Sequence, residues 1–360
     1  MNFIPYGKQT ISQDDISSFI ETLQSDFLTT GSKVTEFEQK IYEQSNAKYC
    51  VSVSNGTAAL HLSALALLNK DDKVLTTPNS FIATANSILY ANAIPIFVDI
   101  CSNGSIDLEL CEDMLKKDSS IKAIFAVSFS GKPLDQEKLQ YIKETYDIKI
   151  LEDNAHSLGI KLTHSDISIF SFHPVKHIAT GEGGAIVTNN KALYEKIKRL
   201  RNHGQDNSHA MLELGFNYRL SDLSCTLGLS QIKKLDAFIE KRQDIAKKYD
   251  DAFKNTPIKP LYPYTDKSVY HLYIICIDFE NIDISREELF KQMREKNIGL
   301  QIHYKPINKQ PYYKSLNYGD ESTPNMDKYS AQCVTLPCFP LLSTTEQDYV
   351  IKTLFEVLDV

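Results

Sequence analysis

Short apolar runs alternate with amphipathic stretches along most of the chain. The runs are rich in Val, Ile and Phe and mostly lack strict polar alternation, which is typical of strands buried on both faces of a parallel sheet. Helical periodicity lies between several of them, as at 57–68 and 191–201. The order predicts an α/β domain with a doubly wound, mostly parallel sheet. The predicted strands are 49–53, 73–76, 95–98, 121–127, 148–151, 167–172 and 184–188.

The pattern changes after about residue 240. A charged helix over about 230–254 leads into a segment rich in Pro and Tyr, 256–268, which has the composition of a linker. A smaller α+β domain is expected beyond it, so the predicted domains are 1–240, with an N-terminal arm, and 241–360. The elements expected in the second domain are strands 271–279 and 298–304 and helices opened by the capping patterns Ser285-x-x-Glu288 and Ser343-x-x-Glu346.

Composition narrows the class of protein. Lys and Arg total 39 against 46 Asp and Glu, a net charge of −7, which disfavours a nucleic-acid partner. The seven Cys form no CxxC pair, so neither a disulfide framework nor a zinc ribbon is expected. The sequence shows no signal peptide and no apolar stretch of the roughly 20 residues that a membrane helix needs. We therefore expect a cytoplasmic protein without a membrane partner.

Two loops that follow predicted strands carry candidate chemistry. Ser54-Asn55-Gly56-Thr57 stands between a strand and a helix, where a glycine and free helical N–H groups can hold a phosphate. A plain capped turn would have the same sequence. Asp153 lies in 152–156, directly after strand 148–151 at the carboxyl edge of the sheet, where a carboxylate can keep a heterocyclic nitrogen protonated. Asp153 as the cap of a turn is the alternative.

The third loop holds Lys176, which follows strand 167–172 and precedes the glycines of 181–184. Most lysines are solvated, and a lysine with a pKa of about 10.4 is almost fully charged at pH 7. Chemistry at Lys176 therefore requires a Schiff base or a depressed pKa. Together the three loops offer a phosphate site, a carboxylate for a ring nitrogen and an amine for an aldehyde. Pyridoxal 5'-phosphate (PLP) requires these three groups.

Several motifs resemble the DegT/DnrJ/EryC1/StrS family of PLP-dependent sugar aminotransferases, from about residue 3 to the C-terminus. The resemblance implies the fold-type I aminotransferase architecture, with a seven-stranded sheet, and a homodimer that shares its active sites. The motifs are SNGTAALH at 54–61, EDNAHSLG at 152–159, FSFHPVK at 170–176, GEGGAIVTNN at 181–190, RNHGQ at 201–205 and GFNYRLSDLSCTLGLSQIKKLD at 215–236.

The resemblance also implies roles for single residues. Lys176 would form the internal aldimine and then move the proton, while Asp153 would pair with the pyridine nitrogen. His156 would lie near the ring and its hydroxyl, and Phe81 would stack on the ring face. The phosphate would be held by Gly56, Thr57 and Ser171, and by Asn217 of the other subunit. An ordinary surface position is the alternative for Asn217.

A narrower resemblance points to the subgroup that acts in the pseudaminic-acid pathway. It rests on 170–176, 301–307, 26–31 and Tyr6. That subgroup transfers an amino group from L-glutamate to C4 of a UDP-linked 4-keto-6-deoxy-N-acetylhexose. The substrate contacts it implies are Tyr6, Asp26, Phe27, Leu28, Thr29, Asn55, His303, Tyr304 and Lys305. A solvated lysine is the alternative for Lys305, and packing between domains is the alternative for Tyr304.

Two features depart from that subgroup. The phosphate loop reads SNGTAA, a form common in the wider family, whereas the subgroup more often has a form like NSATSA. The link at 157–166 is several residues shorter than usual, which should shorten a hairpin near the cofactor. Both features leave the listed chemical groups in place, and another nucleotide keto-sugar remains an alternative substrate.

Other functions would require different sequence features. One branch of the family is a PLP-dependent sugar dehydratase, but that branch has His where this chain has Lys176. A PLP-binding regulator would carry a DNA-binding extension, and residues 1–30 are neither basic nor a helix-turn-helix. A Rossmann dehydrogenase would show GxGxxG after its first strand. The nine His lack the spacing of metal ligands, so no metal is expected.

Overall fold

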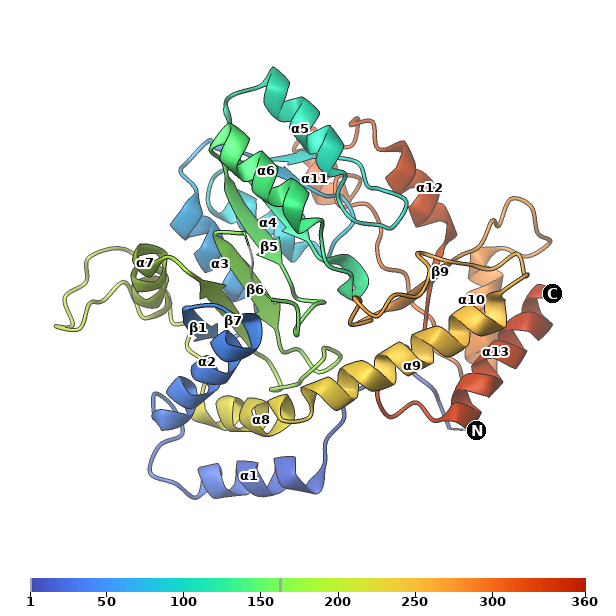
Figure 1. The fold of residues 1–360 in the computed structure, drawn as a ribbon, viewed down its shortest axis with the longest axis horizontal. Helices are drawn as coiled ribbons and strands as arrows, with labels where there is room; N and C mark the ends of the chain where they lie inside the picture. Colours follow the sequence, from blue (N-terminus) through green and yellow to red (C-terminus); the bar gives the residue numbers. More distant parts are fainter. Residues whose placement is uncertain (1, 162–163) are drawn as a thin grey trace.

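The computed structural model describes residues 2–161 and 164–360. A seven-stranded sheet forms the centre of the larger part, in the order β1-β7-β6-β5-β4-β2-β3 (Figure 1). All neighbours pair in parallel except β7, which is antiparallel to both β1 and β6. The predicted mostly parallel α/β sheet is thereby confirmed. Its strands are β1 Tyr49–Val53, β2 Lys73–Thr76, β3 Ile94–Phe97, β4 Ile121–Val127, β5 Lys149–Asp153, β6 Ile167–Ser171 and β7 Gly184–Thr188.

Helices cover both faces of this sheet because successive strand side chains alternate between them. On β1 and β7, Val51 and Ile186 share one buried cluster with helices α3 and α7, whereas Cys50 and Val187 share another with Phe37 of α2. Helices α5 and α6 cover the rest of that second face. The helices of this part are α1 Gln13–Leu23, α2 Ser32–Ser45, α3 Gly56–Leu67, α4 Ala83–Tyr90, α5 Leu108–Lys117, α6 Gln136–Tyr146, α7 Lys191–Arg201 and α8 Asp222–Ile232.

The C-terminal region builds a second buried core around a three-stranded antiparallel sheet, β10-β9-β8. Helix α9, Leu235–Phe253, runs from the large sheet into this core, where Tyr249 stacks on Tyr273 with ring centroids 4.8 Å apart (Figure 1). Because α9 spans residue 240, the domain boundary stays a prediction. The remaining elements are β8 Lys259–Pro260, β9 Tyr273–Cys276, β10 Cys333–Leu336, α10 Arg286–Glu295, α11 Pro311–Ser315, α12 Pro324–Gln332 and α13 Thr344–Leu358.

The N-terminal arm connects the two regions. The Ile4 carbonyl accepts a hydrogen bond from Gly299 at 2.8 Å, and the Tyr6 carbonyl accepts one from Cys338 at 3.0 Å. Further along, the Thr10 carbonyl accepts a bond from the Gln231 side chain of α8 at 2.9 Å. The arm therefore runs across the structure from the C-terminal core to the helices of the large sheet.

Three sequence-based element predictions differ from the structure. The segment 298–304 is no strand, since its ladder contacts are single bridges to Ile4 and Thr335. The strand predicted at 271–279 is limited to Tyr273–Cys276. The helix predicted over 230–254 is two helices, and Lys234 at their junction binds Asp15 of α1 at 2.8 Å. Both capped helices are confirmed, because Ser285 and Ser343 accept bonds at α10 and α13.

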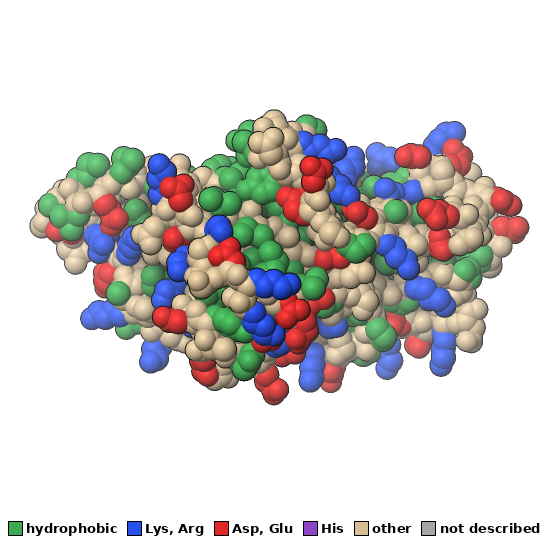
Figure 2. All heavy atoms as spheres, turned by 90° about the horizontal axis from the view of Figure 1, so that it is seen from above, with side chains coloured by type: hydrophobic (Ala, Val, Ile, Leu, Met, Phe, Trp, Pro, Cys, Tyr) green, Lys and Arg blue, Asp and Glu red, His purple; other side chains and the backbone are tan. Residues whose placement is uncertain are grey.

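Two further predictions concern the shortened link at 157–166 and membrane-spanning helices. The shortened link at 157–166 includes positions 162–163, which lie outside the described residues. Across residues 2–161 and 164–360, no helix is both apolar enough and long enough to cross a bilayer. On the face seen in Figure 2, acidic and basic side chains are interspersed around an apolar area near the centre.

Candidate active site

Four strand ends meet at one edge of the large sheet. β1, β5 and β6 point their carboxyl ends to this edge, and the antiparallel β7 begins there, with Gly184 paired to both Val53 and Ser171. In an open α/β sheet, ligands bind beyond the carboxyl ends of the strands. The three loops singled out in the sequence therefore leave the sheet at the same edge.

The first loop is built for a close approach to a ligand. Asn55 caps α3, because its Oδ1 accepts a bond from the Ala58 N–H at 2.8 Å. Gly56 then opens the helix beside Ser171, and a Cβ at Gly56 would lie 3.0 Å from the Ser171 Cβ and 3.2 Å from its Oγ. The N–H groups of a first helical turn have no carbonyl acceptor within their helix. The loop thus presents unpaired donors and a serine hydroxyl in a space that a side chain at Gly56 would fill.

Asp153 is the carboxylate of this edge. Its side chain is 4% exposed, Thr84 of α4 donates to its Oδ2 at 2.7 Å, and the Ala155 N–H donates to its Oδ1 at 3.0 Å. Ser80 lies 2.8 Å from the Thr84 hydroxyl, and since Thr84 donates to Asp153, Ser80 must donate to Thr84. Burial raises the pKa of Asp153, while the Thr84 and Ala155 hydrogen bonds and the charge of Lys176 act in the opposite direction.

Lys176 follows β6 in a turn in which its N–H donates to the His173 carbonyl at 2.8 Å. The side chain is partly buried, and its Nζ lies 3.4 Å from Nε2 of His271. Burial lowers the pKa of Lys176 to about 8; the Asp153 carboxylate opposes this shift and the Arg242 charge adds to it. A useful fraction of Lys176 is therefore a neutral, nucleophilic amine near neutral pH.

A group of neutral imidazoles surrounds this amine. The rings of His156 and His271 lie 4.4 Å apart, and His156 Nε2 lies 3.3 Å from the Tyr304 hydroxyl. Burial lowers the pKa of both histidines well below the usual value, and the charge of Lys176 lowers each of them further. Nδ1 of each ring has no partner and is buried. The pair therefore offers polar ring atoms without adding charge beside Lys176.

His303 packs against Tyr304, and Tyr6 packs against His303. The His303 ring is 4.8 Å from Tyr304 and 5.3 Å from Tyr6, and its Nδ1 lies 2.8 Å from the Thr335 hydroxyl. Burial lowers the pKa of His303 to about 3. Of these predicted substrate residues, Tyr304 contacts His156 directly, and His303 and Tyr6 join the same group of rings through Tyr304.

Other predicted site residues lie apart in this single chain. Phe81 is 57% exposed, although its ring lies 6.4 Å from Tyr304. The segment 26–29 is exposed, and its described contacts run to α8, where Asp222 N–H donates to the Leu28 carbonyl at 3.0 Å. Lys305 and Asn217 are also exposed. Their predicted roles, and those of Thr57 and Asn55, stay predictions.

Three residues of the site were not predicted from the sequence. Thr84 binds the Asp153 carboxylate, His271 touches the Lys176 amine, and Arg242 donates to the His271 carbonyl at 3.0 Å. Thr84, in the first turn of α4, lies three residues after Phe81, so the Phe81 motif contained a signal for it. His271 opens an apolar strand sequence, where a histidine is unusual. Arg242, on a charged helix, has no such signal.

Lys176, whose pKa burial lowers, and the buried Asp153 lie at the same edge of the sheet, an arrangement that an enzyme with an amine nucleophile requires. The chain belongs to the DegT/DnrJ/EryC1/StrS aminotransferase family, whose model matches residues 9–355. It is therefore an aminotransferase of the sugar-aminotransferase kind.

Individual proteins that this chain resembles are named as transaminases or aminotransferases. The chain is 39% identical over 369 residues to a Campylobacter jejuni UDP-4-amino-4,6-dideoxy-N-acetyl-beta-L-altrosamine transaminase, covering 99% of this chain and 98% of the relative. Helicobacter pylori PseC, an aminotransferase of pseudaminic-acid biosynthesis, superimposes with a TM-score of 0.93 at 30% identity, over 99% of this chain and 100% of PseC. Spr1654 of Streptococcus pneumoniae, solved in its PLP form, has a TM-score of 0.91 at 26% identity, over 99% of each chain.

Proposed function

We propose that this enzyme is a PLP-dependent aminotransferase that moves an amino group from L-glutamate to C4 of a UDP-linked 4-keto-6-deoxy-N-acetylhexose. The observation that carries the proposal is that the Lys176 amine and the buried Asp153 carboxylate come from the same edge of the large sheet, where burial lowers the pKa of Lys176 to about 8. The substrate is inferred from the activity for which the C. jejuni relative is named and from the pathway of PseC.

The residues present fit the cofactor. The space at Gly56 beside Ser171, with the first N–H groups of α3, suits its phosphate. The buried Asp153 suits a protonated ring nitrogen, because a cation there relieves the cost of burying the carboxylate. Lys176 is the amine for its aldehyde. When bound, PLP supplies an electron sink for the carbon–hydrogen bond that is broken.

The protein's own groups then handle the proton and the substrate. Lys176 Nζ, once free and neutral, can take a proton from the substrate carbon and deliver it to the carbon on the other side of the nitrogen that is transferred. The His156 ring contacts both the Tyr304 hydroxyl and the ring of His271, and the pKa of Lys176 is set by burial, by the Asp153 carboxylate and by the Arg242 charge. Tyr6 and His303 line the adjoining surface, where we place the sugar.

A homodimer would complete the site. Exposed apolar side chains gather in the loop after α7, where Met211, Leu212 and Leu214 are exposed and Asn217 follows them. Residues 26–29 are exposed as well, so a second copy that covers both segments would bury them. In this arrangement Asn217 reaches the phosphate of the partner's cofactor, and 26–29 contact the substrate. The enzyme is expected to act in the cytoplasm.

A half-reaction panel tests this function. The purified enzyme is loaded with PLP and treated with L-glutamate, which should convert the near-visible band to that of the amine form. UDP-linked and dTDP-linked 4-keto sugars are then added singly. Recovery of the first band only with the UDP-linked N-acetylated sugar supports the proposal. Recovery with a different sugar overturns the substrate, and no conversion by glutamate overturns the amino donor.

A further inference from the structure

His271 has no role in the proposed function, although it contacts Lys176. Its Nε2 lies 3.4 Å from the Lys176 Nζ, whereas its ring lies on that of His156 at 4.4 Å. It stands just before β9, so it comes from the C-terminal region, while Lys176 comes from the edge of the large sheet. One described contact therefore joins the reactive amine to the other core of the molecule.

The backbone around His271 is held from two sides. Arg242, buried within α9, donates to the His271 carbonyl at 3.0 Å and to the Cys338 carbonyl at 2.6 Å. On the other side, the Leu272 N–H donates to the Ser130 carbonyl at 3.2 Å. Gly131, with φ of +103°, packs so closely that a Cβ there would lie 2.9 Å from the His271 N. These contacts fix where the imidazole stands relative to Lys176.

We propose that His271 is a positioning residue for Lys176, whose imidazole Nε2 accepts a hydrogen bond from the free Lys176 amine and holds it at the cluster of neutral rings. The inference rests on the proposed function, in which Lys176 must stay in place while it is not joined to the cofactor. In its ammonium form Lys176 has only donors, so in that form Nε2 has to accept and the ring proton of His271 has to sit on Nδ1.

The physical need for such a partner comes from the lysine itself. A free lysine side chain has about 2 kcal/mol of rotamer freedom and leaves its working position unless a contact retains it. A carboxylate in direct contact would retain it but would also keep it charged. A neutral imidazole retains the amine and allows it to lose its proton. His271 is kept neutral by burial and by the nearby Lys176 charge.

The test measures the amine itself, in enzyme freed of cofactor. Competitive acetylation between pH 6 and pH 10, read by mass spectrometry, gives the pH midpoint at which Lys176 becomes reactive. In His271→Leu the ammonium loses an acceptor, so the midpoint should fall by about one pH unit. Asp153, His156, His177 and Arg242 face the cluster in wild type and in every variant at position 271, so the difference reports on that position.

Two amide variants guard against a folding artefact. The His271→Gln amide can reach the position of Nε2, so it should restore the midpoint to within about 0.3 pH unit. The shorter amide of His271→Asn cannot, and it should behave like His271→Leu. The matched control is His177→Leu, because His177 is buried in the same cluster with Nε2 3.0 Å from the Val269 carbonyl. It should lower the Tm and leave the midpoint unchanged.

The loaded enzyme supplies a second measurement. His271→Leu should lower kcat by about tenfold or more with KM for the sugar within twofold, since the contact acts on the amine and not on substrate binding. An unchanged midpoint in His271→Leu, or an equal shift in His177→Leu, overturns the inference. Failure of the proposed function is a separate result, because the acetylation needs no substrate and the half-reaction panel needs no variant.

Discussion

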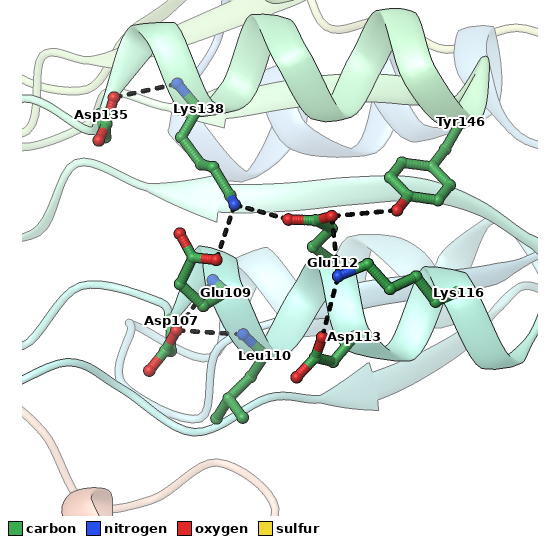
Figure 3. A network of polar contacts seen from close by, with 9 residues as sticks. All are labelled: Asp107, Glu109, Leu110, Glu112, Asp113, Lys116, Asp135, Lys138 and Tyr146. Atoms are coloured by element: carbon green, nitrogen blue, oxygen red, sulfur yellow. Dashed lines mark hydrogen bonds and ion pairs between the residues drawn. The ribbon is translucent and has the colours of Figure 1, made fainter.

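The surroundings of the two lysines Lys138 and Lys176 shift their pKa values in opposite directions. Lys138 of α6 forms ion pairs with Glu109 at 2.7 Å and with Glu112 of α5 at 2.6 Å (Figure 3). Lys116 binds the other oxygen of Glu112 at 2.9 Å. These hydrogen bonds raise the pKa of Lys138 and lower the pKa of Glu112 to about 2. Lys138, Lys116 and Glu112 are thereby held in their charged forms.

Lys176 meets the opposite conditions. Its nearest described polar partner is the neutral ring of His271, and the carboxylate of Asp153 acts on it without a described hydrogen bond. Burial then dominates, and the pKa of Lys176 falls to about 8. The comparison teaches that a carboxylate in direct contact fixes a lysine as a cation, whereas a nearby carboxylate and a neutral contact leave it able to react.

The largest effect should come from removing the reactive amine. Lys176→Ala should lower kcat by at least about 10⁴-fold, since both the nucleophile and the proton carrier are lost. It should also lose the borohydride-sensitive near-visible band of the loaded enzyme. Lys138→Ala is the matched control, because it removes a lysine of the ion-pair network, and its kcat should stay within twofold. A persistent borohydride-sensitive band in Lys176→Ala would contradict the assignment.

The next effect concerns the carboxylate near Lys176. Asp153→Asn keeps a side chain of the same shape for Thr84 but removes the negative charge, so kcat should fall by roughly 10²- to 10³-fold. Affinity for the cofactor, measured by equilibrium dialysis, should fall as well. Asp166→Asn is the control, because Asp166 lies at the opposite end of β6 and binds Lys143 at 3.0 Å. Its kcat should remain unchanged, and equal losses in both variants would refute the special role of Asp153.

The sequence predicted the parts of the site that lie on one element each. Asp153 and Lys176 stand directly after apolar runs, and a parallel sheet places such positions at one edge. The strand at 121–127 and the helix at 191–201 have the predicted bounds, because buried runs and capping residues are local features. Hydrophobic periodicity and position along the chain were sufficient to predict these elements and residues.

The contacts between distant elements could not be predicted in this way. His271 meets Lys176, and Arg242 meets His271, only because α9 and the segment before β9 pack against the edge of the large sheet. The segment 298–304 has the apolar content of a strand, but its backbone groups pair singly with Ile4 and Thr335. Such pairings depend on how the arm and the second core pack, which no local pattern records.

A smaller effect should appear in the stability of the cofactor-free enzyme. The pKa of Lys176 is about 8 in the folded state against the ordinary 10.5, so the folded state binds fewer protons between these pH values. Stability should therefore rise with pH through this window, as the buried ammonium loses its charge. Lys176→Met should be more stable at pH 7 by at most about 3 kcal/mol, at 1.36 kcal/mol per pKa unit.

Urea unfolding at pH 7 and pH 10 measures this difference. The advantage of Lys176→Met should shrink toward pH 10, and Lys138→Met, which removes a lysine with raised pKa, should show no such advantage at pH 7. An advantage of Lys176→Met that is equal at both pH values would mean that the buried charge is not its cause.

The smallest effect belongs to the ion-pair network itself. Lys138→Met should lower the Tm at pH 7 by at most about 2 °C, because pairs near the surface are weakened by water and side-chain entropy. The lowered pKa of Glu112, about 2, stabilises the fold above its ordinary value of 4.5, and this contribution disappears as pH falls toward 2. The Tm difference between wild type and Lys138→Met should accordingly narrow below pH 4.5 and in 1 M salt. Lys122→Met is the control, since the described contact of Lys122 is with the Ser119 carbonyl, and its Tm should not depend on salt. A difference that survives both acid and salt would show that Lys138 stabilises α5 and α6 by packing its methylene groups, and the contrast with Lys176 would then no longer be one of charge.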